Sequence, residues 1–415
     1  MYNICISFLL SILVTVFISE ICGGNDQESR IFCSGISLMC KTEEGNPNCR
    51  VDWPQTPPHP ITCLLENVCI TGPKTIAIYS NSTLHAAFNG VQLSTESLNE
   101  ERHRGVLYKP MQFHHLPKSE KPTDDSLFDP VTGIISGYTN NNNPGHIWGD
   151  IVWPVFRMMY AFSAENDPFQ FLLRVSNAEE FEHGGKAIYT KFLTAVTGRP
   201  YIVLGESDTD YSPKCYKRIF IGSTHLSYSE GNQEARALIE FRNFLFTRLG
   251  YDPSSIAGRT HPKIVILMKH VAPGNSQCAL GNVPEIVEYI QKKYPKAEVV
   301  TVSWMGMPLL QQIETMQSSD IVISHPGSDI MNGIFLKDKA TIFVPCRKLP
   351  QWGIDLSNEV RIWYKIAPFM NVVELCGDED VTYKEGISHM HVSSLDKYFP
   401  SVVHDWYVQN DLTPP

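Results

Sequence analysis

The segment Ile321–Leu336 reads IVISHPGSDIMNGIFL and sets the pattern for the second half of the chain. An apolar, β-branched run stops at the turn Ser324-His325-Pro326-Gly327, and Ser328-Asp329 then open an amphipathic segment. A strand that leads through a tight glycine turn into a helix leaves unpaired backbone N–H groups at the turn, and the helix dipole adds partial positive charge there. The sequence therefore predicts an anion site, suited to a phosphate, in this turn.

The segments around this turn repeat its strand-then-helix pattern. Apolar strands are expected at 263–267, 298–302, 320–323 and 340–344, and short helices at 283–293, 308–317 and 328–336. Strands that are apolar on both faces and alternate with helices are typical of a parallel sheet built from βαβ units. Ligands of such sheets bind beyond the carboxyl ends of the strands, and the turn at 324–327 follows such an end.

The first half of the chain shows the same pattern less regularly. Strands are expected at 75–79, 105–108, 169–175, 201–204 and 218–221, and helices at 147–162 and 186–196. The sequence therefore predicts an α/β protein with two doubly wound, Rossmann-like domains. Their predicted bounds are 74–225 and 226–375, and we expect residues 376–415 to pack back on the first domain.

The amino terminus indicates the compartment. Residues 4–18 form a run of 15 almost wholly apolar residues, which is shorter than the roughly 20 that span a bilayer core. Residues 1–24 are therefore predicted to be a cleaved signal peptide or a short signal anchor, the alternative being a buried core helix. Either of the first two would send the rest of the chain into the secretory pathway. The carboxyl terminus carries no KDEL-type retention signal.

Residues 25–73 form a lead-in rich in cysteine and proline, predicted to be irregular and stapled by disulfides. Its cysteines are Cys33, Cys40, Cys49, Cys63 and Cys69. The chain has no CxxC pair, which argues against zinc, and disulfides are the default in an oxidising lumen. We expect disulfides among these five cysteines that tie the lead-in to the first domain. Asn81-Ser82-Thr83 is a glycosylation sequon, so Asn81 is a predicted glycan site.

The composition excludes some classes of partner. The chain has 415 residues, 43% of them hydrophobic, and this is enough for two domains with cores. A formal net charge of -10 without any basic run argues against a nucleic-acid partner. Because no second apolar stretch is long enough to cross a bilayer, any membrane contact is expected only through an anchor at the amino terminus.

A second cluster that could carry chemistry spans residues 143–154, which read NPGHIWGDIVWP. If a helix begins near His146, then His146 and Asp150 are four residues apart and share one face. A carboxylate beside an imidazole raises its basicity and fixes its tautomer, as a general base for a hydroxyl requires. The alternative is that both residues only stabilise the amino-terminal end of the helix.

Other candidate motifs are weaker. Asp208-Thr209-Asp210 has the pattern of a carboxylate pair that holds a metal on a nucleotide diphosphate. His114-His115 could bind a metal or lie in a solvated loop. Trp352, Trp363 and Tyr364 could stack on a sugar or pack in a core. The chain contains no GxSxG, HExxH, P-loop or GxGxxG motif.

In order and spacing, these motifs resemble glycosyltransferase family 61. The family pattern N-x-x-H-x-x-x-D-x-x-x-P is matched by Asn143, His146, Asp150 and Pro154. Its second pattern, an apolar strand followed by H-G-A-x-L-x-N, is approached by residues 320–332. The Glu-Gln pair of the preceding helix corresponds to Gln311-Gln312, and Cys63–Cys69 resembles the opening of the family domain. The resemblance covers roughly residues 63–376.

The chain departs from the family at two places. Lys269-His270 follow the strand at 264–267, where the family has arginine residues, and Gln311 replaces a glutamate. These departures bear on donor affinity and donor identity. The missing arginines also support a different class of protein, a catalytically inactive glycan-binding protein of the lumen. A luminal hydrolase would need paired carboxylates about 5–10 Å apart, and the sequence suggests no such pair.

The resemblance implies an inverting, GT-B-like transferase in which two domains face a cleft. The donor would be a UDP-sugar, first UDP-N-acetylglucosamine and second UDP-xylose, and the acceptor a glycoprotein or glycan in the Golgi or endoplasmic reticulum. His146 or Asp150 would be the catalytic base. The residues expected on the donor side are Asn143, Lys269, Ser324, His325, Gly327 and Ser328. Lys269 and backbone amides near Gly327 would oppose the diphosphate charge, so no metal or other cofactor is expected.

Overall fold

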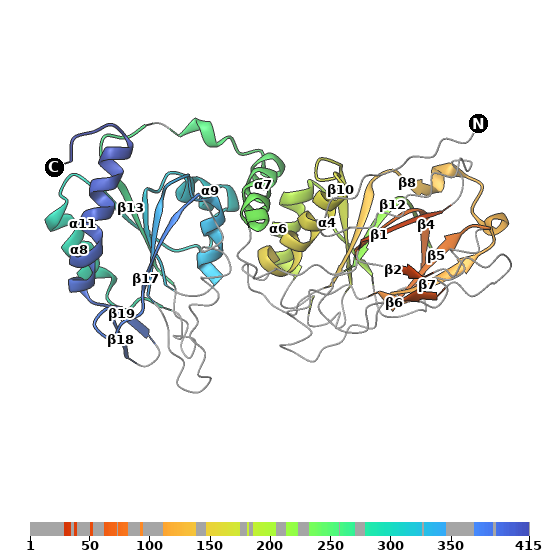
Figure 1. Ribbon diagram of the computed structural model, residues 1–415, viewed down its shortest axis with the longest axis horizontal. Coiled ribbons are helices and arrows are strands. Elements are labelled where there is room, and N and C mark those ends of the chain that lie inside the picture. The colour runs from red at the N-terminus through yellow and green to blue at the C-terminus, as the bar shows by residue number, and fades with distance from the viewer. Residues whose placement is uncertain are drawn as a thin grey trace. The chain divides into compact units, whose positions relative to one another are not determined.

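A computed structural model shows the fold of the chain (Figure 1). It describes residues 29–34, 37–39, 50–52, 62–72, 74–81, 92–93, 111–137, 147–174, 181, 186–204, 213–222, 232–256, 258–269, 279–325, 328–345, 369–384 and 387–414. Contacts divide the chain into two compact units. The first is Met1–Tyr138, Met158–Glu179 and Tyr201–His225, and the second is Thr139–Arg157, Glu180–Pro200 and Leu226–Pro415. This division differs from a single boundary near residue 225, because two earlier segments group with the second unit.

The first unit is built on one mixed sheet. Its strands are β1 (Arg30–Ser34), β4 (Thr62–Gly72), β5 (Thr75–Tyr79), β6 (Gln92–Leu93), β7 (Met111–Leu116), β8 (Phe128–Asp129), β9 (Thr132–Gly137), β10 (Phe169–Arg174), β11 (Ile202–Leu204) and β12 (Lys214–Gly222). The order is β11-β10-β9-β12-β4-β5-β7-β6, with β1 beside β4 and β8 beside β12. The 3-10 helices η1 (Lys118–Glu120) and η2 (Asp125–Leu127) lie between β7 and β8.

Only part of this sheet has the parallel arrangement that was predicted. β11, β10, β9 and β12 run parallel to one another, but β4 is antiparallel to its partners β12, β5 and β1. The two residues between β4 and β5 explain the difference. A link this short can form a hairpin, whereas a parallel pair needs a crossover of a dozen residues or more. The expectation of a doubly wound first domain is therefore corrected to a mixed sheet.

The end of the lead-in is a strand inside this sheet and not an irregular segment. Cys63, Leu65, Val68 and Ile70 of β4 are fully buried in the core of the first unit. Sequence reasoning took the cysteines of 62–72 as signs of a stapled loop and so passed over the apolar run that contains them. One disulfide joins Cys69 of β4 to Cys215 of β12. Cys63 and Cys376 are also disulfide-bonded, and Cys40 and Cys49 lie outside the described residues.

The second unit contains a five-stranded sheet in which all strands are parallel. The strands are β13 (Lys263–Leu267), β14 (Glu298–Val302), β15 (Ile321–Ile323), β16 (Thr341–Pro345) and β17 (Asn371–Leu375). Their order is β14-β13-β15-β16-β17. The helices of this unit include α6 (Lys186–Thr197), α7 (Asn232–Leu249), α8 (Val283–Lys293), α9 (Leu309–Gln317), η6 (Ser328–Phe335) and α11 (Val392–Gln409). The alternation predicted for residues 263–344 is confirmed within two residues at every boundary.

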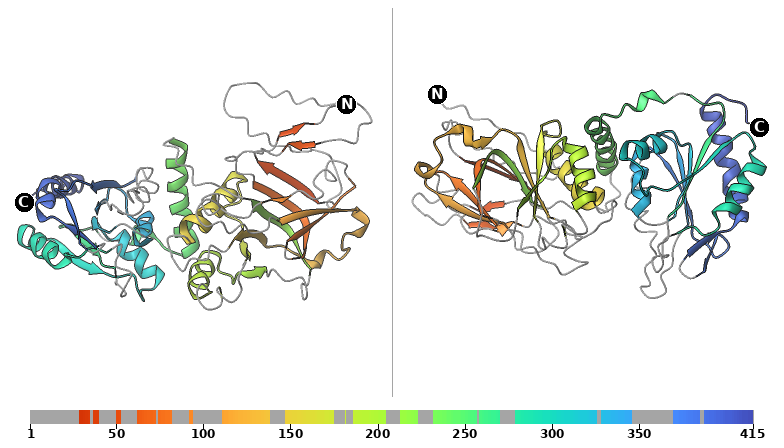
Figure 2. Two further views of the ribbon diagram at one scale, coloured as in Figure 1. Left: turned by 90° about the horizontal axis from the view of Figure 1, so that it is seen from below. Right: turned by 180° about the vertical axis from the view of Figure 1, so that it is seen from behind.

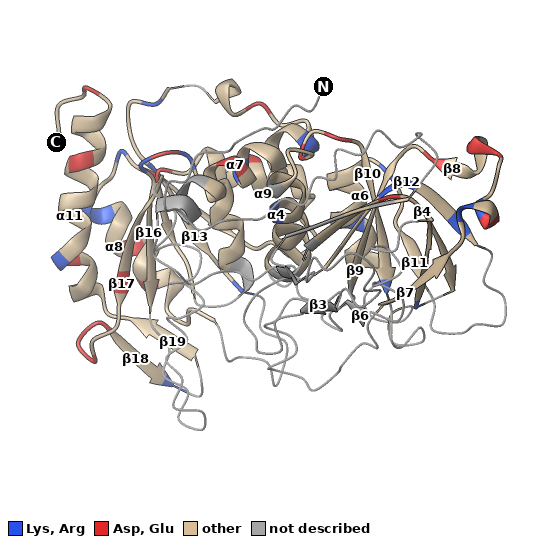
Figure 3. Cartoon of the chain, turned by 45° about the vertical axis from the view of Figure 1, so that its right-hand side comes forward, with Lys and Arg blue, Asp and Glu red and all other residues tan. Residues whose placement is uncertain are grey.

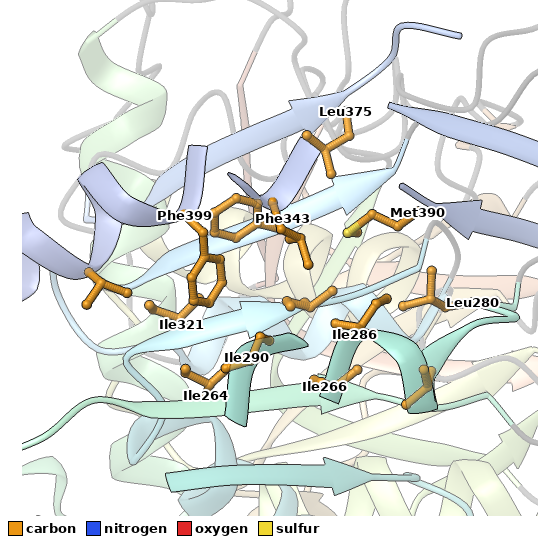
Figure 4. Close-up of a cluster of buried hydrophobic side chains, with 14 of the residues drawn as sticks. Ile264, Ile266, Leu280, Ile286, Ile290, Ile321, Phe343, Leu375, Met390 and Phe399 are labelled. Atoms are coloured by element: carbon orange, nitrogen blue, oxygen red, sulfur yellow. The ribbon is translucent and has the colours of Figure 1, made fainter. Parts of the chain in front are cut away.

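Helices cover both faces of this parallel sheet, with α8 and α11 on one face and α9 on the other (Figures 1 and 2). The core on the α8–α11 face contains Ile264, Ile266, Ile321, Phe343 and Leu375 from the strands, Ile286 and Ile290 from α8, and Phe399 from α11 (Figure 4). Alternate strand residues such as Val265, Val322 and Ile342 are also fully buried. Burial on both faces explains why these strands are continuous apolar runs.

The carboxyl-terminal segment packs on this second sheet, which corrects the expectation that it returns to the first domain. Leu395, Phe399 and Val403 of α11 belong to the same core as the strands β13, β15 and β16. The buried carboxylate of Asp320 adds a polar contact, because it accepts a hydrogen bond of 2.6 Å from the indole nitrogen of Trp406. The apolar face of α11 was visible in the sequence, but nothing local showed which sheet it would cover.

The remaining described elements are short. They are the strand pair β2 (Ser37–Met39) and β3 (Arg50–Asp52), the hairpin β18 (Val381–Lys384) and β19 (Ile387–Met390), and the 3-10 helix η5 (Pro253–Ser255). Among the residues that the structure describes, no helix combines the length and the apolar character needed to cross a membrane. The predicted leader at residues 1–24 lies outside the described part.

Candidate functional site

The parallel sheet has a point at which its strand order reverses. β13 comes first along the chain, β14 lies on one side of it and β15 on the other. In open α/β sheets, ligands bind outside the carboxyl ends of the two strands that flank such a switch point. Lys269 lies two residues beyond β13, and Ser324 and His325 directly follow β15. The fold thus places three of the predicted donor residues beside the switch point.

The first two residues of the predicted phosphate turn are fully buried. Ser324 and His325 have no exposed surface. The backbone N–H of Ser324 donates to the carbonyl of Phe343 in β16 at 2.9 Å, and its hydroxyl donates to the carbonyl of His325 at 3.0 Å. Neither side chain is therefore exposed to a ligand at the surface. Gly327 lies outside the described residues, so its role stays a prediction.

The helix that follows the turn is a 3-10 helix and not an α-helix. η6 covers Ser328–Phe335, so Ser328 is its first residue and not the cap before it. Asn332-Gly333 in the interior have low α-helical propensity, which explains the preference for the tighter form. The placement of Ser328 still puts its backbone N–H at the amino-terminal end of η6, where intrahelical acceptors are missing.

Side chains from two other helices hold η6. Asn332 donates to the side-chain oxygen of Gln312 in α9 at 2.8 Å, and Gln317 in α9 donates to the carbonyl of Phe335 at 2.7 Å. Arg242 in α7 donates to the carbonyl of Leu336 at 3.0 Å. All these side-chain groups are buried or nearly so. The second half of η6 and Leu336 are therefore fixed by hydrogen bonds from neighbouring helices.

Arg242 also anchors the residues beyond η6. Its guanidinium donates to a carboxylate oxygen of Asp338 at 2.8 Å and lies 4.0 Å from the centre of the Phe369 ring. A planar guanidinium can make in-plane hydrogen bonds and stack on an aromatic face at the same time. Arg242 is therefore occupied by structural contacts.

The segment that carries the predicted base begins with a π-helical turn. η3 covers Ile147–Val152 and continues directly into α4 (Trp153–Ala161). Pro154 accounts for the wide turn, because its ring clashes with the carbonyl four residues earlier, at Asp150, and it has no N–H to donate. Such π-helical turns are frequent at functional sites. Pro154 therefore shapes the helical turn that contains the backbone of Asp150, and both residues are positions of the family pattern.

The described residues give only part of the predicted base. The backbone of Asp150 lies in η3, but His146 and Asn143 lie outside the described residues. Whether the His146 imidazole meets the Asp150 carboxylate therefore stays a prediction. Thr139–Arg157, which contains all three residues, groups with the second unit, although it was expected in the first.

A single aromatic residue joins this segment to the segment after β15. The indole ring of Trp148 in η3 meets the Phe335 ring of η6 with centroids 5.7 Å apart, and the Phe192 ring of α6 with centroids 5.1 Å apart. Both contacts are edge to face, a favoured geometry for aromatic pairs. Trp148 is 1% exposed. Two motifs nearly 180 residues apart in the sequence are therefore packed together inside one unit.

The other candidate motifs have different outcomes. His114 and His115 lie in strand β7 and not in a loop. Asp208–Asp210, Trp352, Trp363 and Tyr364 lie outside the described residues. Within the described ranges, no group of three or more His, Cys, Asp or Glu side chains is placed to hold a metal ion. The side chain of Asn81 is exposed, and its oxygen accepts from the backbone of Lys118 at 3.3 Å, so glycosylation there stays a prediction.

Sequence reasoning missed several residues that shape this site. Trp148, Arg242 and Gln317 were not singled out, although each makes a contact that fixes η6. A polar residue inside an otherwise apolar helix face was the available signal for Gln317. The signal for Trp148 was weaker, since a tryptophan beside a motif is equally compatible with ordinary core packing.

Comparison with known families gives one match over the middle of the chain. Residues 145–343 match the family model described as Glycosyltransferase 61. The matched range contains η3, the parallel strands from β13 through most of β16, and η6. None of the curated proteins matches the chain. The matched range also contains β10, β11 and β12 of the first unit, so it includes segments of both units.

Proposed function

We propose that the chain transfers a sugar from a UDP-sugar to a glycoprotein or glycan, with inversion at the anomeric carbon, because residues 145–343 match the family model described as Glycosyltransferase 61. One observation carries the proposal. The residues expected to face the donor, Lys269 and the segment Ser324–Ser328, follow the two strands that flank the switch point of a parallel sheet. N-acetylglucosamine is the first choice of sugar and xylose the second.

The proposed chemistry is a single displacement at the anomeric carbon. His146 or Asp150 takes the proton of the acceptor hydroxyl while its oxygen bonds to the anomeric carbon. The bond between that carbon and the β-phosphate oxygen of UDP breaks at the same time, and its electron pair stays on the diphosphate. The products are the glycosylated acceptor, UDP and a protonated base. The contact of Trp148 with Phe335 supports this assignment, because it holds η3 beside η6.

The leaving diphosphate gains negative charge during the reaction. The ammonium group of Lys269 and the backbone N–H groups at the start of η6, which lack intrahelical acceptors, would stabilise that charge, as helix termini commonly do for phosphates. Lys269 is half-buried, which strengthens its interaction with an anion relative to a fully solvated cation. On this scheme the transferase needs no metal.

Two features support a place in the lumen of the endoplasmic reticulum or Golgi. The disulfide between Cys69 and Cys215 joins two core strands of the first unit, and such bonds persist in oxidising compartments. The apolar run at residues 4–18 would serve as an entry signal for the secretory pathway. A donor-hydrolysis screen of the secreted protein with UDP-sugars, with and without EDTA, tests the function. Hydrolysis of no UDP-sugar would contradict it, and loss in EDTA that manganese restores would contradict only the metal-independent scheme.

A second candidate is a catalytically inactive glycan-binding protein on the same fold. The observation that favours it is Lys269-His270, which stand where the family has arginines after β13, because a weaker diphosphate site would reduce donor binding. Thermal unfolding with and without UDP separates the two functions. A transferase should be stabilised by UDP through binding to the folded state, whereas a protein that binds only glycan should unfold at the same temperature in both samples.

A further inference from the structure

The side-chain amide of Gln312 uses both of its ends inside the protein. Gln312 lies in the first turn of α9 and is 4% exposed. Its oxygen accepts the 2.8 Å hydrogen bond from Asn332. Its nitrogen donates to the carbonyl of Met307 at 2.9 Å and lies 3.5 Å from the carbonyl of Trp304. An amide with partners on both sides is a connector, because losing it leaves buried polar groups unsatisfied on each side.

The partners of Gln312 belong to two segments that follow strand ends at the same edge of the sheet. Trp304 and Met307 lie in the loop between β14 and α9, and Asn332 lies in η6 after β15. Since the strands are parallel, both segments start from carboxyl ends. The loop at 303–308 contains Met305, which is 68% exposed, and Gly306, whose φ of 76° favours glycine. Lys191 of α6 also donates to the Met307 carbonyl, at 3.0 Å.

We propose that Gln312 is a positioning residue that couples the 303–308 loop to η6 and so sets the affinity of the site for a nucleoside diphosphate sugar. The identity of this ligand rests on the proposed function, whereas the coupling does not. When the loop at 303–308 is held in place, Gln312 holds Asn332 and with it η6, whose first backbone N–H groups lack intrahelical acceptors. Gln312 does not touch the reacting atoms and acts through these two segments.

Gln317 is the matched control. It lies on the same helix, it is also 4% exposed, and its amide donates to the carbonyl of Phe335 at the far end of η6. Truncating either residue should remove a buried hydrogen bond to η6 and lower stability. Only Gln312 also contacts the 303–308 loop. A purely structural role for Gln312 would therefore make the two variants behave alike.

The test compares Gln312→Ala and Gln317→Ala in the full chain by amide hydrogen exchange and by donor kinetics. The Met307 amide donates to the Trp304 carbonyl at 3.1 Å and reports on the loop. We expect Gln312→Ala to speed exchange at Met307 and in η6 by about tenfold or more, a change of about 1.4 kcal/mol. The Michaelis constant for the UDP-sugar should rise by a similar factor while kcat changes little. Gln317→Ala should speed exchange in η6 alone.

Asn332→Ala provides a second, independent measurement if Gln312→Ala fails to fold. It removes only the η6 side of the connection, so faster exchange at Met307 in this variant would show that the coupling passes through Gln312. Unchanged exchange at Met307 would overturn the coupling. Equal donor Michaelis constants in Gln312→Ala and the wild type would overturn the positioning role while leaving the transferase in place. A wild-type protein that does not bind UDP would overturn the proposed function and the donor part of this inference, and exchange would still decide the coupling.

Discussion

The edge of the Trp148 ring meets the Phe335 ring with an interplanar angle of 78°. Trp148 lies in η3, two residues before Asp150, and Phe335 is the last residue of η6. The contact joins the segment of the predicted base to the segment of the predicted phosphate site. Both segments belong to the second unit, and this buried pair of rings packs them against each other.

This pair predicts a specific effect of Trp148→Ala. Removing the buried indole should lower the free energy of unfolding by about 3–5 kcal/mol, the range for large aromatic truncations. It should also weaken UDP binding, because η6 loses a packing partner. Phe181→Ala is the control, since Phe181 is equally buried and packs against Tyr189 of α6. Urea unfolding and calorimetry check both variants, and UDP affinity that falls equally in the two would contradict a link through Trp148.

The proposed base predicts a loss of turnover without loss of donor binding. His146→Ala and Asp150→Asn should each lower kcat by at least about 10²-fold, the lower end of the range for a lost general base. Their affinity for UDP should stay close to that of the wild type, because neither residue is assigned to the diphosphate. Steady-state kinetics and calorimetry measure the two quantities. Near-normal turnover in both variants would show that the residues only stabilise the start of η3.

The turn after β15 predicts a loss of UDP binding in Gly327→Val. A side chain at this position would block the close approach of a phosphate to the backbone. Ser328→Ala should weaken binding by about 1 kcal/mol, the typical contribution of one hydrogen bond. Circular dichroism must first show that both proteins are folded. Unchanged affinity in folded Gly327→Val would remove the phosphate from this strand end.

The contact between α8 and α11 predicts a pH-dependent stability. Hydrogen bonds from Lys293 and Tyr289 hold the pKa of Asp396 below its usual range, and both helices carry charged residues of both signs (Figure 3). Burial and the Asp396 hydrogen bond raise the pKa of Tyr289 to about 12. A lowered carboxylate pKa stabilises the fold above the unfolded value of about 4, and this contribution disappears as the pH falls through the folded value.

The measurement is the melting temperature of the wild type and of Asp396→Asn between about pH 6 and pH 2. The variant should melt below the wild type near neutral pH and converge with it under acid conditions. Asp405→Asn is the control, because Asp405 is another exposed carboxylate of α11. The idea fails if Asp405→Asn changes the acid dependence as much as Asp396→Asn does.

The buried carboxylate of Asp320, directly before β15, predicts a loss of stability when its indole partner is removed. Trp406→Phe removes the indole N–H that donates to Asp320 and keeps most of the apolar contact. A hydrogen bond to a charged group contributes about 1.5–3 kcal/mol, so the free energy of unfolding should fall by about that amount. Tyr407→Phe removes a hydroxyl that pairs with His261 at 3.0 Å. This variant should lower the free energy of unfolding by less than Trp406→Phe does. Equal decreases in the free energy of unfolding of the two variants would show that the hydrogen bond to the Asp320 carboxylate is no stronger than the one between Tyr407 and His261.

The parallel sheet of the second unit was predictable because its signal is local. β13, β15 and β16 contain short, largely apolar runs, β14 is rich in valine, and each helix between these strands has an apolar face of the expected period. The turn after β15 was recognisable for the same reason. Burial on both faces leaves no other stable arrangement for such strands, so periodicity and length alone fixed these elements.

The strand arrangement of the first unit and the placement of α11 depended on contacts between residues that are distant in the sequence. β4 looked like a loop because its cysteines suggested staples, and its place in the sheet is set by pairing with β12, nearly 150 residues later. Similarly, the apolar face of α11 was compatible with either unit until packing placed it on β13, β15 and β16. Pairing partners at long sequence separation leave no local pattern, because each segment alone is satisfied by many alternatives.

The amino-acid sequence by itself therefore determined the elements at the switch point and the match of residues 145–343 to the glycosyltransferase 61 family model. It did not specify that Trp148 would pack on Phe335, or that Gln312 would link Met307 to Asn332. These contacts depend on side-chain directions from separate helices that meet only after the sheet has formed. Periodicity records which face of an element is buried, but the partner on that face is selected by the shape and hydrogen-bonding groups of the assembled core.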